Sequence, residues 1–196
     1  MTRNPRLPLL LAVLALLFQT LTAEQPTIAP TLPPIGPWML TQSGAPAHWL
    51  GHKWQGKVLY EPINVVIIDT VSTTRRQAIR TLVKACKLAG YAVRGGHSSG
   101  YQASIDGQLF QQIPDNRMMA FSNARYTVEN NHGRIMGPCR WENAFVFVAA
   151  FSREAYTPLA SPPHSFLSFT VARDDFTARC NDLSERMLLI DDDLEF

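Results

Sequence analysis

The residues best suited to chemistry lie between positions 130 and 174, where polar side chains stand at the ends of apolar runs. The run 144–151 has the composition of a β-strand, and a serine, an arginine and a glutamate follow it directly. A strand end presents a side chain rigidly at an open rim, which is where clefts are built. The predicted catalytic residues are therefore His132, Arg134, Arg153, Glu154, His164 and Arg173.

A stretch rich in glycine and serine, 95–101, is a loop by composition and carries a further histidine. This loop could join the residues at the strand ends and contribute to binding rather than to proton transfer. The residues predicted to bind a substrate are His97, Ser98, Tyr101 and Asn131.

These residue types would suit the hydrolysis of a phosphoester or a similar anionic ester. Arg134, Arg153 and Arg173 would hold the anion through bidentate hydrogen bonds. His132 and His164 would act as acid and base, because imidazole is the side chain that titrates near neutral pH.

A metal site is a second interpretation of the same residues. His97, His132 and His164, together with Glu154 or Asp174, would supply the ligand types that zinc takes. Neither His-x-His nor His-Glu-x-x-His spacing occurs in the chain, however. No metal ligand and no cofactor are therefore assigned from the sequence.

A purely structural role is the third interpretation. The neighbouring charges Arg153-Glu154 and Arg173-Asp174 would form ion pairs that lock strand ends to helices. The two histidines His132 and His164 would then satisfy buried backbone groups. An enzyme requires these side chains to converge on one open cleft, whereas a structural role does not.

The clearest secondary structure precedes these residues. The run 63–69 is apolar on both faces, which is typical of a central strand covered on both sides. Apolar residues at helical spacing predict a helix over 75–89, and Gly90 supplies its left-handed stop. An extended segment over 91–93 completes a strand–helix–strand unit.

The remaining pattern predicts strands over 109–113, 118–122, 126–128, 144–151 and 165–171. A last helix is predicted from Asp174 or Asp175, with acidic residues in its first turn as the helix dipole prefers. Its predicted apolar face consists of Phe176, Cys180, Leu183, Met187 and Ile190. The predicted fold class is α+β, with one mixed β-sheet packed by two main helices.

The first 23 residues have the three parts of a secretory signal peptide. Arg3 and Arg6 precede the apolar run 7–18, and Ala23 is the small residue before the expected cleavage point. Because the apolar run is shorter than the roughly 20 residues needed to span a bilayer, no transmembrane helix is expected after cleavage. The sequence thus predicts a periplasmic or extracellular protein.

Removing this leader takes two arginines from 18 basic residues, which leaves 16 against 16 acidic ones. A formally neutral protein has no long-range field that attracts nucleic acid, so a nucleic-acid partner is not expected.

Residues 24–57 are predicted to be a proline-rich tether or arm, in which Trp38, Trp49 and Trp54 pack on the domain or stack on carbohydrate. Residues 58–196 are predicted to form one α+β domain.

The cysteine count is three. In an oxidising compartment one disulfide and one spare thiol would be usual, and Cys86 and Cys180 on the buried faces of their helices could bridge. Buried free thiols explain them equally well. Cys139 follows Gly-Pro in a turn, where a nucleophilic role is a minor alternative.

The last third of the chain resembles the LssY-like C-terminal domain of bacteria. The resemblance rests on His132-Gly133-Arg134, on the strand that leads to Ser152-Arg153-Glu154, and on His164 followed by Ala172-Arg173-Asp174. It implies a membrane-associated or exported domain and brings no settled activity.

The sequence therefore predicts an exported binding or accessory domain that serves an envelope component or a partner protein. The alternative is a hydrolase of a phosphoester or similar anionic ester that uses a histidine and arginine site.

Overall fold

The computed structural model describes residues 31–114, 118–181 and 187–190. The predicted signal peptide and the first prolines of the predicted tether lie outside the described residues. The compact unit begins at Leu32, which is earlier than the start near position 58 that the strand pattern indicates. The physical reason is that Met39, Ala47 and Trp49 are already buried.

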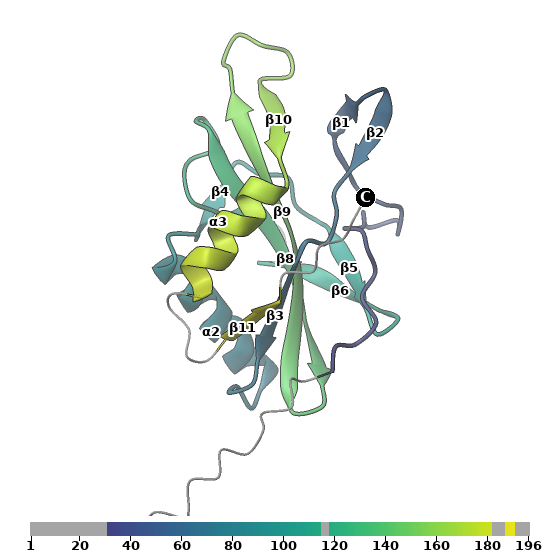
Figure 1. Ribbon diagram of the computed structural model, residues 1–196, viewed down its shortest axis with the longest axis vertical. Coiled ribbons are helices and arrows are strands. Elements are labelled where there is room, and N and C mark those ends of the chain that lie inside the picture. Colours follow the sequence, from purple (N-terminus) through teal and green to yellow (C-terminus); the bar gives the residue numbers. More distant parts are fainter. Residues whose placement is uncertain (1–30, 115–117, 182–186, 191–196) are drawn as a thin grey trace, which may run out of the picture. The chain divides into compact units, whose positions relative to one another are not determined.

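Nine strands of the described residues join in one sheet, and two more form a separate hairpin (Figure 1). The sheet strands are β3 (Val65–Asp69), β4 (Ala92–Gly95), β5 (Gln102–Ile105), β6 (Gln108–Ile113), β7 (Met119–Ser122), β8 (Asn130–Trp141), β9 (Ala144–Tyr156), β10 (His164–Ser168) and β11 (Met187–Ile190). The hairpin consists of β1 (His48–Trp54) and β2 (Lys57–Tyr60), and the helices are α2 (Arg75–Leu88) and α3 (Thr170–Asn181).

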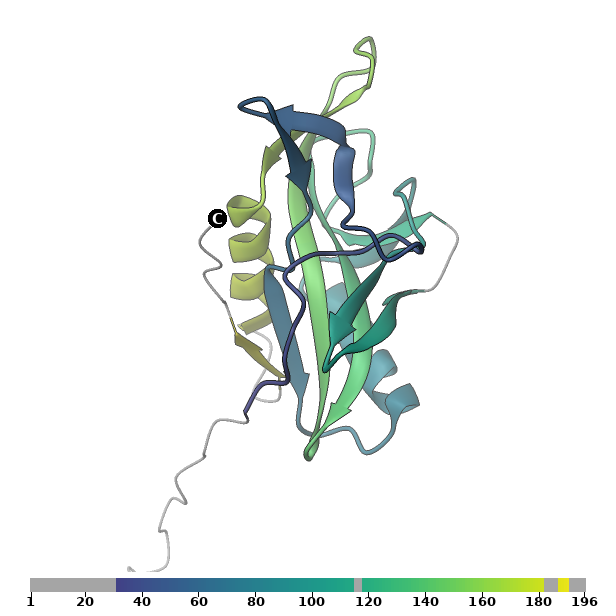
Figure 2. The same ribbon diagram turned by 90° about the vertical axis from the view of Figure 1, so that its right-hand side faces the viewer.

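The sheet runs in the order β11-β3-β9-β8-β6-β5, with β10 on β9, β7 on β8 and β4 on β7. The fold class α+β is confirmed, but the pairs between described strands are antiparallel rather than mixed. The long β8–β9 hairpin sets this direction, because only two residues connect its strands (Figure 2). Its register runs from Asn130 opposite Glu154 to Trp141 opposite Ala144.

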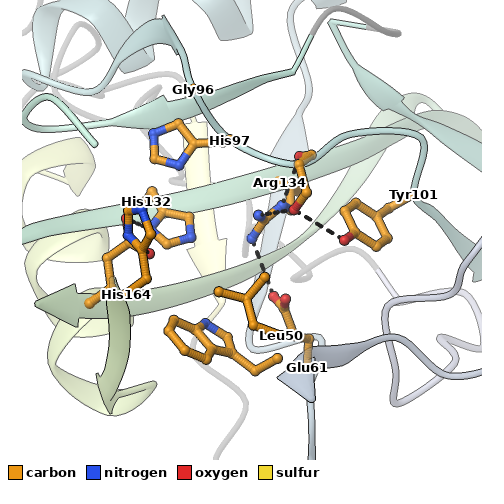
Figure 3. Close-up of a pocket in the computed structure, with 11 residues that line it drawn as sticks. Leu50, Glu61, Gly96, His97, Tyr101, His132, Arg134 and His164 are labelled. Atoms are coloured by element: carbon orange, nitrogen blue, oxygen red, sulfur yellow. Dashed lines mark hydrogen bonds and ion pairs between the residues drawn. The ribbon is translucent and has the colours of Figure 1, made fainter. Parts of the chain in front are cut away.

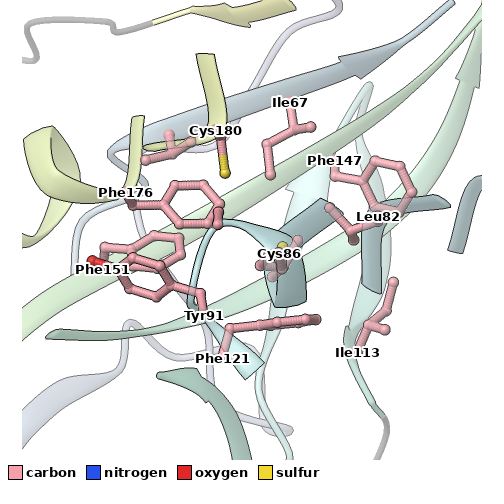
Figure 4. Packing of buried hydrophobic residues seen from close by; sticks show 14 of the residues in the cluster. Ile67, Leu82, Cys86, Tyr91, Ile113, Phe121, Phe147, Phe151, Phe176 and Cys180 are labelled. Carbon is pink, nitrogen blue, oxygen red and sulfur yellow. The ribbon is translucent and has the colours of Figure 1, made fainter. Parts of the chain in front are cut away.

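The alternation of side chains along β9 divides the core into two. Phe145, Phe147 and Phe151 belong to one buried cluster with the helix residues Leu82 and Phe176, and Figure 4 shows this packing for Phe147 and Phe151. Of the side chains of opposite parity, Ala144 and Val146 belong to a small cluster with Val66 and Ile68. Val148 and Ala150 belong to a second large apolar cluster, built with the N-terminal segment and the β5–β6 pair. This second cluster consists of Met39, Ala47, Ile63, Ala103, Ile105, Met136, Cys139, Val148 and Ala150.

Helix α2 confirms the clearest prediction. The Thr74 hydroxyl caps its first turn by accepting a hydrogen bond from the backbone N–H of Gln77 at 3.2 Å. Gly90 follows its end with a φ of +87°, which glycine adopts without strain. The buried face is Ala78, Leu82 and Cys86.

Other predicted elements differ. Residues 126–128 form a turn rather than a strand, and α3 begins at Thr170, so neither aspartate lies in its first turn. Phe176 and Cys180 are buried as predicted. The predicted helix face does not continue to Met187 and Ile190, because the backbone of 187–190 pairs with β3. Leu183 lies outside the described residues.

Neither of the two helices described has the length and hydrophobicity needed to cross a bilayer.

Cys86, Cys139 and Cys180 are buried free thiols in the structure. Burial raises the pKa of each thiol, that of Cys180 to about 12, which keeps the thiols protonated. The disulfide between Cys86 and Cys180 stays a prediction.

The close approach of Gly133 to Phe151 provides a test of this packing. The two residues are cross-strand partners, and a Cβ added to Gly133 would lie 2.5 Å from the Phe151 ring. We expect Gly133→Ala to lower the free energy of unfolding by about 2 kcal/mol in urea denaturation. Gly95→Ala is the matched control, since its Cβ would meet nothing within 4 Å. Equal stability of both variants would contradict this packing.

Candidate functional site

Strand parity places a group of polar residues on the sheet face away from the helices. His132 and Arg134 have the parity of Met136 on β8, and Glu154 has the parity of Ala150 on β9. The pairing of β8 with β9 sets His132 opposite Ser152. All four residues are buried, at 4 % exposure or less.

Three other segments close over this group. The β1–β2 arm contributes Trp49 and Leu50, the segment after β2 contributes Glu61, and the loop after β4 contributes His97. They enclose a cavity of about 90 Å³, with the three histidines together on one side and Arg134 on the other (Figure 3). The cavity is lined by Trp49, Leu50, Glu61, Gly96, His97, Ser98, Tyr101, His132, Arg134, Glu154 and His164.

The Glu154 carboxylate lies between two imidazoles. Its Oε1 is 3.7 Å from Nδ1 of His132, and its Oε2 is 3.3 Å from Nδ1 of His164. The Asn130 amide donates a hydrogen bond to Oε1 at 2.9 Å, which fixes the carboxylate. His164 is the most exposed of these groups, with 17 % of its side chain accessible.

The buried histidines His97 and His132 are held neutral. Their rings stack with centroids 4.6 Å apart. Burial, together with the nearby Arg134 charge, lowers the pKa of His97 to about 4 and that of His132 well below its usual value. A neutral imidazole keeps one nitrogen lone pair, which can accept a proton or bind a metal ion.

A hydrogen-bond chain orients His132. Its Nδ1 lies 3.1 Å from Oδ1 of Asn130, whose amide nitrogen donates to Glu154. This arrangement assigns the proton to Nδ1 and the lone pair to Nε2. Ser152 Oγ lies 3.4 Å from Nε2 and accepts a hydrogen bond from the Trp49 indole at 3.2 Å.

Arg134 forms the other wall of the pocket. Its Nη1 lies 3.4 Å from a Glu61 oxygen, and its Nη2 donates to the Ser98 hydroxyl at 2.7 Å. The guanidinium also lies over the Tyr101 ring, 5.3 Å from its centroid. Burial raises the pKa of Glu61, and the Arg134 charge opposes that rise.

The structure brings most of the predicted site residues into this one pocket. Those that line it are His97, Ser98, Tyr101, His132, Arg134, Glu154 and His164. Its two walls therefore come from strand ends and from the glycine- and serine-rich loop.

The other predicted site residues lie elsewhere. Arg153 and Asn131 have the opposite parity, so Arg153 pairs with Glu129 and Asn131 donates to Asp175 of α3. Arg173 lies on α3 and pairs with the adjacent Asp174 of the same helix, so this pair does not join a strand end to a helix. None of the three reaches the pocket.

Sequence reasoning missed Glu61, Asn130 and Ser152 as parts of the site. Asn130 and Ser152 stand two residues from His132 and Glu154, so strand alternation would have found them. Glu61 carries no such signal, because it is 73 positions from Arg134 in the chain.

No family model matches the chain, and no curated protein or solved structure matches it significantly.

The buried ion pair between Arg134 and Glu61 leads to a stability prediction. Glu61→Gln removes the countercharge of the Arg134 side chain, which is 5 % exposed, so we expect a loss of about 3 kcal/mol in the free energy of unfolding. Glu129→Gln removes the partner of the more exposed Arg153 and should cost less than about 1 kcal/mol. Urea denaturation of both variants measures the difference. Equal losses of stability in the two variants would mean that burial does not strengthen the ion pair between Arg134 and Glu61.

Proposed function

We propose that this protein is a hydrolase of a phosphoester or a similar anionic ester and that the pocket is its active site. The observation that carries the proposal is the position of Glu154 between His132 and His164, in the same cavity as Arg134. Both histidines contact one carboxylate, so they are close enough to act on one substrate.

His164 is the group proposed to transfer protons. Its imidazole is partly accessible to solvent, and Glu154 orients it as a carboxylate orients a catalytic histidine. His132 is fully buried and its pKa is lowered, which disfavours protonation and suits a ligand rather than an acid. Arg153 and Arg173, which lie outside the pocket, have no role in this proposal.

Arg134 is proposed to bind the anionic group. Glu61 and Ser98 engage three of the five N–H donors that a guanidinium has, so donors remain for a ligand. The cavity of about 90 Å³ admits the reacting group of a substrate and little more. The rest of the substrate would lie outside, along the rim that includes the half-exposed Leu50.

The proposal includes an exported location. It rests on the leader pattern of residues 1–23 and on the resemblance of residues 132–174 to the LssY-like C-terminal domain.

Hydrolysis of chromogenic phosphoesters and carboxylic esters that carry an anionic group tests this proposal. We expect His164→Gln to lower kcat/KM by about 100-fold or more, the usual contribution of a proton-transfer group. Arg134→Lys should raise KM for the anionic esters, because a lysine cannot make the bidentate contact. Arg153→Lys is the matched control and should behave as wild type. The proposal fails if no ester is hydrolysed, or if the His164 and Arg153 variants lose activity equally.

A second candidate function is binding through a groove lined with aromatic residues. Trp38, Trp54, Tyr60 and Phe166 line a cavity of about 570 Å³, and Trp54 is 58 % exposed. Exposed aromatic rings of this kind stack on the apolar faces of sugars. This groove supports the alternative of an accessory domain for an envelope polysaccharide.

Sedimentation with insoluble peptidoglycan or other envelope polysaccharides tests the second candidate. Trp54→Ala should weaken the binding by about 10-fold, since a stacked ring contributes on the order of 1 kcal/mol or more. Leu109→Ala, another exposed apolar residue, should bind as wild type. Unchanged binding of the Trp54 variant would exclude the groove.

A further inference from the structure

We propose that the pocket binds a divalent metal ion of the zinc type through His97, His132 and Glu154. One ring nitrogen of each histidine and one oxygen of the glutamate lie within 4.8 Å of one another. The three residues come from the loop after β4, from β8 and from β9, and all are buried. Two histidines and a carboxylate form a ligand set that catalytic zinc sites use.

The charge on Glu154 is the first argument. Buried carboxylates are normally paired with a cation or coordinate a metal ion. In the described part of the chain, no lysine or arginine pairs with Glu154, whose neighbours within ion-pair distance are the imidazoles of His132 and His164. A divalent ion would supply the missing positive charge.

An imidazole nitrogen without a hydrogen bond is the second argument. Nε2 of His97 is buried and has no hydrogen-bond partner in the structure. A buried polar atom without a partner costs free energy, so native proteins usually satisfy it with protein, water or an ion. This nitrogen belongs to a side chain that lines the cavity.

The support around the ligands is the third argument. Asn130 accepts from Nδ1 of His132 at 3.1 Å and donates to Oε1 of Glu154 at 2.9 Å, so one amide orients two of the ligands. Metal-binding histidines and carboxylates characteristically have such outer hydrogen bonds. A second bond from the Asn130 amide, to the Val128 carbonyl at 2.9 Å, holds that amide in turn.

The distances require a small adjustment on binding. Ligand atoms around a tetrahedral zinc ion at 2.0–2.2 Å are about 3.4 Å apart. Closing a spacing of up to 4.8 Å to this value requires the two ligand atoms to approach each other by up to about 1.4 Å. The cavity of about 90 Å³ has room for the ion and for the water at its open fourth position.

This inference deepens the proposed hydrolase and rests on it for the role of the ion. A zinc ion lowers the pKa of its bound water to about 7, and His164 beside Glu154 is placed to take the proton. Without the ion, the two carboxylates Glu61 and Glu154 outnumber the single guanidinium of Arg134. The ion makes the formal charge positive, so that an anionic ester is attracted.

Metal analysis of the full chain, without an affinity tag, tests the site independently of catalysis. We expect one zinc per chain after zinc loading and dialysis, measured by elemental analysis, and saturable zinc binding by calorimetry. His97→Gln and Glu154→Gln should each weaken binding by about 100-fold or more, at least as much as the loss of an outer hydrogen bond. His48→Gln and Glu129→Gln are the matched controls, because both residues are exposed and lie outside the cavity.

The outcomes separate this inference from the proposed hydrolase. Zinc binding by wild type without ester hydrolysis would keep the metal site and reject the hydrolase. Hydrolysis that persists in chelator-treated, zinc-free protein would reject the catalytic ion. Absence of stoichiometric zinc in wild type, or equal affinity of ligand and control variants, would overturn the metal site.

Thermal unfolding with and without zinc shows whether each variant folds and whether zinc stabilises it. If His97→Gln or Glu154→Gln is unfolded, the cobalt(II) absorption spectrum of wild type shows whether the metal site exists. A tetrahedral spectrum at one equivalent is expected, and the spectrum of free cobalt would overturn the site.

Discussion

The pairing of β8 with β9 is the constraint on which both the core and the pocket depend. Side chains alternate along each strand, so one face of the hairpin receives Phe147 and Phe151 and the other receives Glu154. A slip of one residue would reverse one strand and so turn either Phe151 into the pocket or His132 into the helix core. The match between Gly133 and the Phe151 ring opposes such a slip, because only a glycine leaves room for that ring.

The two faces have opposite energetic roles. The helix face buries aromatic and aliphatic side chains, which stabilise the fold. The pocket face buries Glu61, Arg134 and Glu154, and taking charges out of water costs free energy that their mutual attraction only partly offsets. Such an arrangement is expected where a protein keeps reactive groups dry and fixed for binding or catalysis.

The sequence predicts elements whose apolar pattern is regular. Strand β3, helix α2 and strand β9 follow from β-branched runs and helical spacing, and they appear within a few residues of the expected bounds. Strand β8 was not predicted, because its first five residues are four polar residues and a glycine rather than an apolar run. At the C-terminus, apolar spacing continued past Asn181 in helical register, yet 187–190 pairs as a strand because the edge of β3 is available to it.

The site was predicted by residue type more than by geometry. A single sequence shows which histidines and charged residues stand at strand ends. Which of these side chains share a face of the sheet depends on the strand register, which the sequence does not give. Arg153 was therefore included wrongly beside Glu154, although neighbours in a strand point to opposite faces. Glu61 could not be found, since only the tertiary fold brings the segment after β2 over β8.

The metal-binding pocket on the face away from the helices is the central claim, and a crystal structure of the zinc-soaked protein tests it most directly. The account predicts one anomalous difference peak in the cavity, about 2.0–2.2 Å from His97, His132 and Glu154, with a solvent-facing position left open. A map without that peak, in which the three side chains hydrogen-bond only to one another, would contradict the account.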